Sequence, residues 1–402
     1  MLRGYSYSGW MVAALAAAAV AASPGKLAAQ TVKIGIINSY TGFVAEPADQ
    51  AQKGMDLYVK EHEKDLPQGV KLEIVKRDDT SKPDVGKRVA QELITRDHVQ
   101  LLAGIILSPV ATAVAPLTAA AKVPLVICGA GAGVAIPRLS PYVARVTFTL
   151  WQEAYPMGKW AAQQGWKTAY TAVTDFIAGH DAEAGFSRSF TEADGKIIGA
   201  DRFPPQNPDF TPFVQRIKNA KPQVAYVFVP AGEQATAMMK AISDLGLRQA
   251  GIEIAAPQDL LPDEDLPLMG EAPLGLITAG TYSVAAKRPA NAAFLADWKA
   301  AYGDKSIPDF FSVDGWDGMA MIFDLIKATN GQFTADQAMA FFKNWKGPNS
   351  PRGPIEIDPQ TRDIVQNIYI RRVEKVDGQL ANIEISTIPM VKDPWKELNP
   401  QK

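Results

Sequence analysis

Short apolar runs alternate with amphipathic segments along the first third of the chain. The β-branched and apolar runs predict strands at residues 32–38, 71–77, 101–106 and 124–128, and the segments with helical spacing predict helices at 46–60, 83–96 and 110–121. Pro83 opens the second helix, with Asp79 or Ser81 as its expected cap. Because strands buried on both faces belong to parallel sheets covered by helices, the alternation predicts a doubly wound α/β lobe with right-handed crossovers.

A second series of the same kind begins after residues 145–149. It predicts strands at 168–173, 196–203, 223–229 and 251–255, and helices at 152–164, 181–193, 211–220 and 234–245. This series predicts a second doubly wound lobe of similar size. The rest of the chain predicts a strand-like run at 274–279, helices at 291–301, 313–328 and 335–344, and a β-rich stretch at 355–373. They have no complete sheet of their own, so we expect them to finish both lobes, with more than one crossing of the chain between lobes.

The first thirty residues differ from the rest of the chain. Arg3 is followed by an uncharged, mostly apolar run at 10–22 and then by small residues up to Ala29. The run is too short to span a bilayer core of ~30 Å as a helix. It predicts a secretory signal peptide at residues 1–29 that is cleaved near Ala29, with a retained signal anchor as the alternative. We therefore expect an exported protein.

Charge and composition exclude several classes of function. The chain has 41 basic and 43 acidic side chains, a formal net charge of −2, and no block of like charges, so we expect no nucleic-acid partner. A single cysteine, Cys128, excludes an internal disulfide. Three scattered histidines give no metal-ligand spacing, and we expect neither a metal nor another cofactor.

An open parallel sheet binds its ligand at the carboxyl ends of its strands, so the loops after the strands hold the candidate site residues. Ser108 precedes Pro109 at a helix start, where its hydroxyl is placed either to cap the helix or to receive a carboxylate beside free N–H groups. The other candidate ligand-binding residues lie in the corresponding loops: Phe43, Ala130, Ala132, Phe176, Ala178, Ala231, Gln258 and Asp259.

No catalytic motif is complete in this sequence. The glycines at 129, 131 and 133 are spaced G-x-G-x-G and not as the G-x-G-x-x-G of a dinucleotide loop. No G-x-S-x-G nucleophile elbow occurs, and Asp181 beside His180 at a helix start is better placed to support the helix dipole than to complete a triad. We expect no catalytic residues, with a secreted α/β hydrolase as the weakest alternative.

Several segments together resemble the solute-binding proteins of branched-chain amino-acid-type ABC importers. They are the strand VKIGIINSYTG, the element VKRDDTSKPDVGKRVAQELI, the run HVQLLAGIILSPVATAVAPLTAAAKVPLVICGAGA and the later VDGWDGMAMIFDLIKATNG, and with the leader the similarity extends over essentially the whole mature chain. The resemblance implies the type I periplasmic binding protein fold, with two lobes joined by a three-crossover hinge and a ligand trapped as they close. It also implies a periplasmic monomer that delivers its ligand to an inner-membrane ABC permease.

By position, the resemblance makes Ser108 the serine that holds the ligand carboxylate, and Ala130 and Ala132 backbone contacts. Two departures concern the rest of the ligand. Where the family often has an aromatic side chain before Gly179 this chain has Ala178, and where amino-acid binders place an acid for the ammonium it has Gln258, followed by Asp259. A branched-chain or other hydrophobic amino acid and an aromatic carboxylate both remain candidates, and a one-residue shift would return Asp259 to the acidic role.

The expected organisation follows from the resemblance and the pattern together. Residues 31–147 and about 280–350 form lobe I, 148–279 and about 351–385 form lobe II, and 386–402 form a C-terminal tail. The expected function is an exported receptor of an ABC importer for a small carboxylate-bearing ligand. The alternative in the same fold is a sensor that presents its ligand to a membrane receptor.

Overall fold

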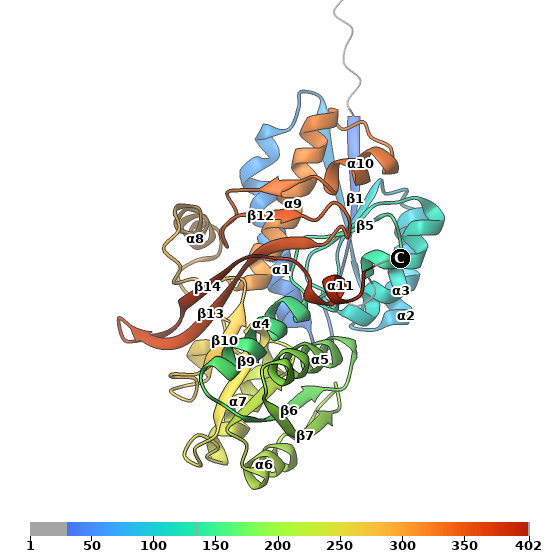
Figure 1. Ribbon diagram of the computed structural model, residues 1–402. Helices are drawn as coiled ribbons and strands as arrows, with labels where there is room; N and C mark the ends of the chain where they lie inside the picture. Colours follow the sequence, from blue (N-terminus) through green and yellow to red (C-terminus); the bar gives the residue numbers. More distant parts are fainter. Residues whose placement is uncertain (1–29, 134–135, 401–402) are drawn as a thin grey trace, which may run out of the picture.

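The computed structural model describes residues 30–133 and 136–400, which form two α/β halves (Figure 1). The predicted signal peptide and its cleavage site near Ala29 lie outside the described residues. Within the described part of the chain, no helix combines the length and apolar character needed to cross a membrane.

The first half contains five parallel strands in the order β2–β1–β3–β4–β5. They are β1 (Gln30–Asn38), β2 (Val70–Asp78), β3 (Leu101–Gly104), β4 (Leu125–Ile127) and β5 (Val143–Arg145). The helices of this half are α1 (Ala45–His62), α2 (Pro83–Thr95), α3 (Ser108–Ala121), α9 (Phe310–Thr329) and α10 (Ala335–Phe342). Ile36 packs in one core with Met319 of α9, while the next residue, Ile37, packs in another with Leu93 of α2. Successive strand residues therefore bury opposite faces, and the predicted doubly wound lobe is confirmed.

The second half repeats this arrangement with five parallel strands in the order β10–β9–β8–β6–β7. They are β6 (Thr168–Thr174), β7 (Lys196–Phe203), β8 (Val224–Phe228), β9 (Glu253–Pro257) and β10 (Ile277–Gly280). The helices are α4 (Leu150–Gln163), α5 (Ile177–Glu192), α6 (Thr211–Ala220) and α7 (Glu233–Asp244). The apolar core that contains Ile37 continues across α4 and α5 onto one face of this sheet, and a separate core with α6 and α7 covers the other face.

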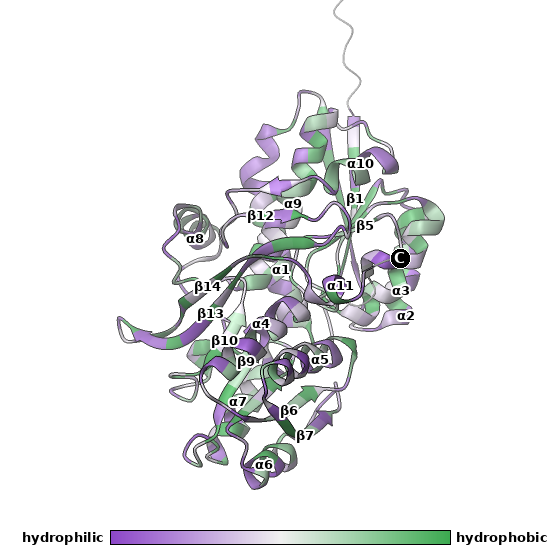
Figure 2. Cartoon of the chain, in the orientation of Figure 1, coloured by the Kyte–Doolittle hydropathy of each residue, from purple (hydrophilic) through white to green (hydrophobic). Residues whose placement is uncertain are grey.

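The C-terminal strands add an antiparallel extension that the sequence pattern did not resolve. β11 (Lys346–Gly347), β12 (Ile355–Ile357) and β13 (Ile364–Val376) continue the second sheet beyond β10, and β14 (Gln379–Val391) pairs with β13. β14 extends past residue 385, where a tail was expected to begin, and α11 (Pro394–Leu398) follows it. Most of β14 is exposed or half-buried, so it lacks the apolar run by which the other strands were recognised. Figure 2 shows the tip of this hairpin in purple, as hydrophilic, whereas α8 (Pro289–Tyr302) is of mixed hydropathy.

Two of the expected helix caps are wrong. The cap of α2 is Lys82, with no side-chain hydrogen bond, because Asp79 instead accepts from the Ser39 hydroxyl at 2.6 Å and from the Ser81 N–H at 2.8 Å. The cap of α3 is Leu107, and Ser108 is the first helical residue. In both cases the side chain that the local sequence predicts as a cap forms a hydrogen bond with a residue distant in sequence instead: Asp79 with Ser39, and Ser108 with Ala132.

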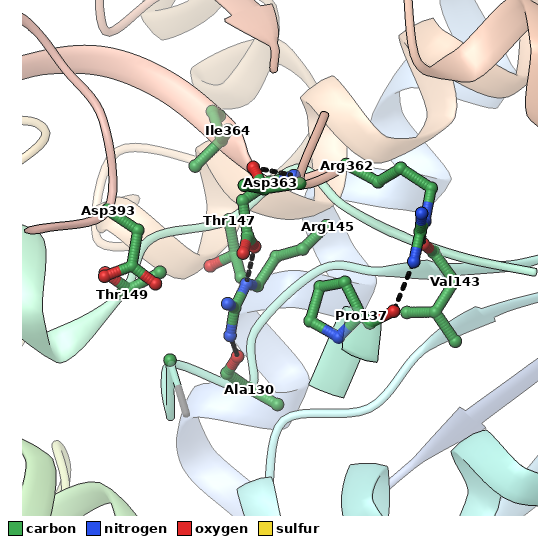
Figure 3. A network of polar contacts seen from close by, with 12 residues as sticks. Ala130, Pro137, Val143, Arg145, Thr147, Thr149, Arg362, Asp363, Ile364 and Asp393 are labelled. Atoms are coloured by element: carbon green, nitrogen blue, oxygen red, sulfur yellow. Dashed lines mark hydrogen bonds and ion pairs between the residues drawn. The ribbon is translucent and has the colours of Figure 1, made fainter. Parts of the chain in front are cut away.

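The chain passes between the halves after β5, after β10 and along β13. Ile364, the first residue of β13, packs with Ile355 in a core of the first half, whereas Ile370 of the same strand pairs with Ala279 of β10 in the second. Buried ion pairs join these passages. Arg352 contacts both Asp314 and Asp317 of α9, and Arg145 of β5 contacts Asp363 beside β13 (Figure 3).

Candidate functional site

A cavity lies between the two halves at the carboxyl ends of both sheets. About 40 Å³ of it is open to the centre of a water-sized sphere, so the cavity is narrow. Segments from both halves line the cavity. The first half contributes Val44, Pro47, Ile106, Leu107, Ser108, Gly129, Gly131 and, from α9, Phe311. Phe148 and Leu150 lie where the chain crosses after β5, and the second half contributes Phe176, Ala178, Phe228, Pro230, Ala231 and Asp259. Any ligand held here touches both halves.

Five of the nine predicted site residues line this cavity: Ser108, Phe176, Ala178, Ala231 and Asp259. They come together because each follows a strand, and parallel strands direct their carboxyl ends to one edge of the sheet. Helix α5 begins at Ile177, four residues before its predicted start, so Ala178 lies in its first turn and presents only a methyl group to the cavity.

The other four predicted residues are outside the lining. Ala130 and Ala132 are fully buried, and the glycines between and before them face the cavity instead. Phe43 is partly buried and packs against the core of the first half. Gln258 is buried beneath the cavity, where its side-chain oxygen accepts from the Thr281 N–H at 2.8 Å.

Arg145 explains the position of the loop that carries Ala130 and Ala132. Its guanidinium is fully buried and donates to the carbonyl oxygens of both residues, at 3.1 Å for Ala130, while it pairs with Asp363 (Figure 3). Because these two carbonyls face Arg145, it is the backbone of Gly129 and Gly131 in the same loop that lines the cavity. The sequence pattern identified the loop but could not identify which of its residues line the site.

Ser108 acts as a tertiary link and not as the helix cap that was one of its two predicted roles. Its Oγ accepts from the Ala132 N–H at 3.0 Å, which ties the start of α3 to the loop after β4. Within residues 30–133 and 136–400, no acceptor takes the hydroxyl proton or the backbone N–H of Ser108. Both donors lie at the N-terminus of a fourteen-residue helix, where the helix dipole favours a negative charge.

Aromatic rings make up much of the remaining wall. The rings of Phe148 and Phe311 meet edge to face with centroids 6.0 Å apart, and those of Phe176 and Phe228 lie 5.9 Å apart. Phe228 ends a strand and could have been found by the same rule as the predicted residues. Phe311 could not, because it belongs to α9, more than 160 residues away from its ring partner Phe148 in sequence.

Asp259 is the ionisable side chain among the described residues that line the cavity, and it is 5% exposed. Burial raises the pKa of Asp259 to about 7. Burial also raises the pKa of the neighbouring Glu153 well above its ordinary range, and the nearby Asp259 carboxylate adds to that shift. No lysine or arginine is among the described residues that line the cavity.

One hydrogen bond links the halves at the side of the cavity. The backbone N–H of Gly133, after β4, donates to Oδ2 of Asp181 in α5 at 2.7 Å. The expected role of Asp181 as dipole support is therefore replaced by a contact to the other half. His180 instead bonds to Asp175 on the surface.

The described residues beside the cavity include neither a metal-binding group nor a reactive cysteine. In the residues that the structure describes, no group of three or more His, Cys, Asp or Glu side chains is arranged to hold a metal ion. Cys128 is fully buried, and burial raises the pKa of its thiol to about 12, which keeps it protonated and unreactive.

A family model described as periplasmic binding protein matches residues 31–379. The chain belongs to the periplasmic binding protein family. The Leu/Ile/Val-binding protein homolog 6 of Brucella melitensis is 38% identical over 383 residues, which cover 95% of this chain and 97% of that protein.

Solved structures of this family place the chain among ABC transporter solute-binding proteins. One from Rhodopseudomonas palustris BisB5, in complex with 3,4-dihydroxybenzoic acid, is 44% identical with a TM-score of 0.87 and covers 91% of this chain and 99% of that one. Another from Rhodopseudomonas palustris HaA2, in complex with p-hydroxybenzoic acid, is 39% identical with a TM-score of 0.87 and covers 92% and 100% of the two chains. The expected family and type I fold are confirmed, and the chain is a solute-binding protein of an ABC transporter.

Proposed function

We propose that this solute-binding protein captures an aromatic carboxylate between its two halves and delivers it to an inner-membrane ABC permease. The observation that carries the proposal is the pairing of an aromatic-walled cavity with free donors on Ser108 at the N-terminus of α3. A flat ring fits between phenylalanine side chains, and a desolvated carboxylate needs several donors. The two related R. palustris proteins, in complex with hydroxylated benzoic acids, support the same class of ligand.

A branched-chain or other hydrophobic amino acid is the second candidate, and Asp259 is the observation in its favour. An ionised carboxylate at that position would pair with the ligand's ammonium group. Its raised pKa and the absence of further acidic side chains from the described lining favour the aromatic acid.

The further elements of the proposal concern the cellular setting. We place the protein in the periplasm after removal of residues 1–29, as a monomer that uses no cofactor. Domain closure supplies the mechanism, in which ligand contacts with both halves favour the closed form. The residues we assign to ligand binding are Ser108, Phe176, Ala178, Ala231 and Asp259, with the backbone of the loop that contains Ala130 and Ala132.

A thermal-shift screen separates the candidates. We would test benzoate, 4-hydroxybenzoate, leucine, phenylalanine and glucose against the purified mature protein. A bound ligand at a hundredfold excess over its Kd adds about 2.7 kcal/mol to the free energy of unfolding, which gives a clear shift. Stabilisation by the benzoates is the expected result. Stabilisation by leucine alone would mean that the ligand is an amino acid and not an aromatic acid. Stabilisation by glucose alone would contradict the proposal that the ligand carries a carboxylate.

A further inference from the structure

Beneath Asp259 lies a group of buried polar side chains that no other feature of the fold explains. Glu153 of α4, Tyr226 of β8 and Arg371 of β13 meet there with Gln258 and Asp259 after β9. Each of the five is wholly or almost wholly buried. They come from four different elements, so the group exists only in the folded protein.

These side chains do not satisfy one another. Within the described residues, one polar atom of each has no hydrogen-bond partner: Oε1 of Glu153, the hydroxyl of Tyr226, Nε2 of Gln258, Oδ2 of Asp259 and Nη2 of Arg371. Buried polar atoms are nearly always paired, and leaving one unpaired costs about 1–3 kcal/mol. Oδ2 of Asp259 is the unpaired acceptor of this group that belongs to a residue of the cavity wall, where a polar group of a bound ligand can meet it.

Asp259 is the member of this group that reaches the cavity. It follows a strand of the second sheet, whereas Ser108 follows a strand of the first, so the two line the cavity from opposite halves. A ligand whose carboxylate lies at Ser108 would therefore extend across the cavity and present its far end to Asp259.

The charges of the group argue against an ammonium at that far end. Three buried carboxyls, those of Asp263, Glu153 and Asp259, share the guanidinium of Arg371. Burial raises the pKa of each of these carboxyls, and with its proton in place the carboxyl of Asp259 is neutral. A neutral group binds a hydroxyl by hydrogen bonding but offers no net counter-charge to an amine.

We propose that Asp259 is a specificity-determining residue whose carboxyl binds a ring hydroxyl opposite the carboxylate of an aromatic acid, so that the protein prefers hydroxylated aromatic acids to unsubstituted ones and to amino acids. This inference rests on the proposed function and names the ligand more closely. It also differs from the ammonium role that the sequence left open for Asp259.

The test is a cycle of two ligands and two proteins, measured by isothermal titration calorimetry with benzoate and 4-hydroxybenzoate. For the wild-type protein we expect 4-hydroxybenzoate to bind about ten- to a hundredfold more tightly, the effect of one hydrogen bond to a charged or strongly polar group. In Asp259→Ala the ratio of the two affinities should fall to about one, while benzoate affinity changes little. Asp259→Asn, which keeps a hydrogen-bonding amide of the same shape, should restore part of the ratio and provides a second variant if the alanine variant fails to fold.

Asp244→Asn is the matched control, because Asp244 is an exposed carboxylate at the end of α7 that pairs with Lys240. Its ratio should equal that of the wild type. Equal binding of the two acids by the wild-type protein, or an unchanged ratio in Asp259→Ala, would overturn the inference while leaving the proposed function intact. If neither acid binds the wild-type protein, the proposed function itself fails, and tight phenylalanine binding that is lost in Asp259→Asn would return Asp259 to the ammonium role.

Discussion

Replacing Ser108 by alanine should have two effects that can be measured separately. The first is on the ligand-free protein, in which Ser108 Oγ is the acceptor for the Ala132 N–H at 3.0 Å and both residues are buried. Alanine leaves that N–H without its partner, which costs about 1–3 kcal/mol in the free energy of unfolding. The second is on binding, because the hydroxyl is one of the donors that we assign to the ligand carboxylate.

The binding effect should be moderate and not absolute. A charge-assisted hydrogen bond is worth about 1.5–3 kcal/mol, so the Kd for 4-hydroxybenzoate should rise about ten- to a hundredfold. Binding should persist because the backbone N–H of Ser108 and the dipole of α3 remain in the variant.

Urea unfolding of the ligand-free protein, followed by circular dichroism, measures the first effect, and calorimetric titration measures the second. Ser243→Ala, an exposed serine-to-alanine change in α7, is the control and should alter stability by no more than about 0.5 kcal/mol. A stability loss in Ser108→Ala no larger than in this control would refute the assigned hydrogen bond. An unchanged Kd would show that the carboxylate does not bind at Ser108.

Two further predictions concern the contacts that hold the halves together. Arg352→Met removes a buried guanidinium from between two buried carboxylates and should lower the free energy of unfolding by about 3–5 kcal/mol, whereas Arg202→Met, at a half-exposed surface pair, should cost no more than about 1 kcal/mol. The second prediction concerns Asp265. Burial, and next the nearby carboxylate of Glu46 in α1, raise the pKa of Asp265 to about 7. Between about pH 4 and 7 the Asp265 carboxyl therefore binds a proton more tightly in the folded protein than in the unfolded chain. The contribution of Asp265 to stability therefore falls as the pH rises through that window, and Asp265→Asn, which keeps an acceptor for the Gly232 N–H, should lose less stability than the wild type between pH 5 and 8.

Both predictions are checked by urea unfolding, at fixed pH for the arginine variants and at pH 5 and 8 for the aspartate variant. Equal losses in Arg352→Met and Arg202→Met would mean that the buried pairs contribute no more than surface pairs. An identical pH dependence in Asp265→Asn and the wild type would mean that Asp265 does not hold a proton in the folded state.

The sequence predicted the site best where local rules govern it. Ser108, Phe176 and Asp259 follow strands, and the topology of a parallel sheet brings such residues to one edge whatever else the chain does. It was wrong about the caps of α2 and α3, because buried partners far away in sequence compete for the same hydroxyl and carboxyl groups. It did not identify Phe311 as a cavity residue, because that residue reaches the site only when α9 packs against the first sheet.

The apolar and polar pattern by itself determined the two doubly wound lobes, since burial on both sheet faces leaves apolar runs in the parallel strands and helical spacing of apolar residues in the helices that cover them. Only the tertiary structure decided how the C-terminal strands complete them: β14 is mostly exposed, and its place depends on pairing with β13 and not on an apolar run. The same holds for the polar side chains beneath Asp259. Glu153, Tyr226 and Arg371 lie up to 218 residues apart in sequence, and no local pattern records a contact that forms only when α4, β8 and β13 are packed together.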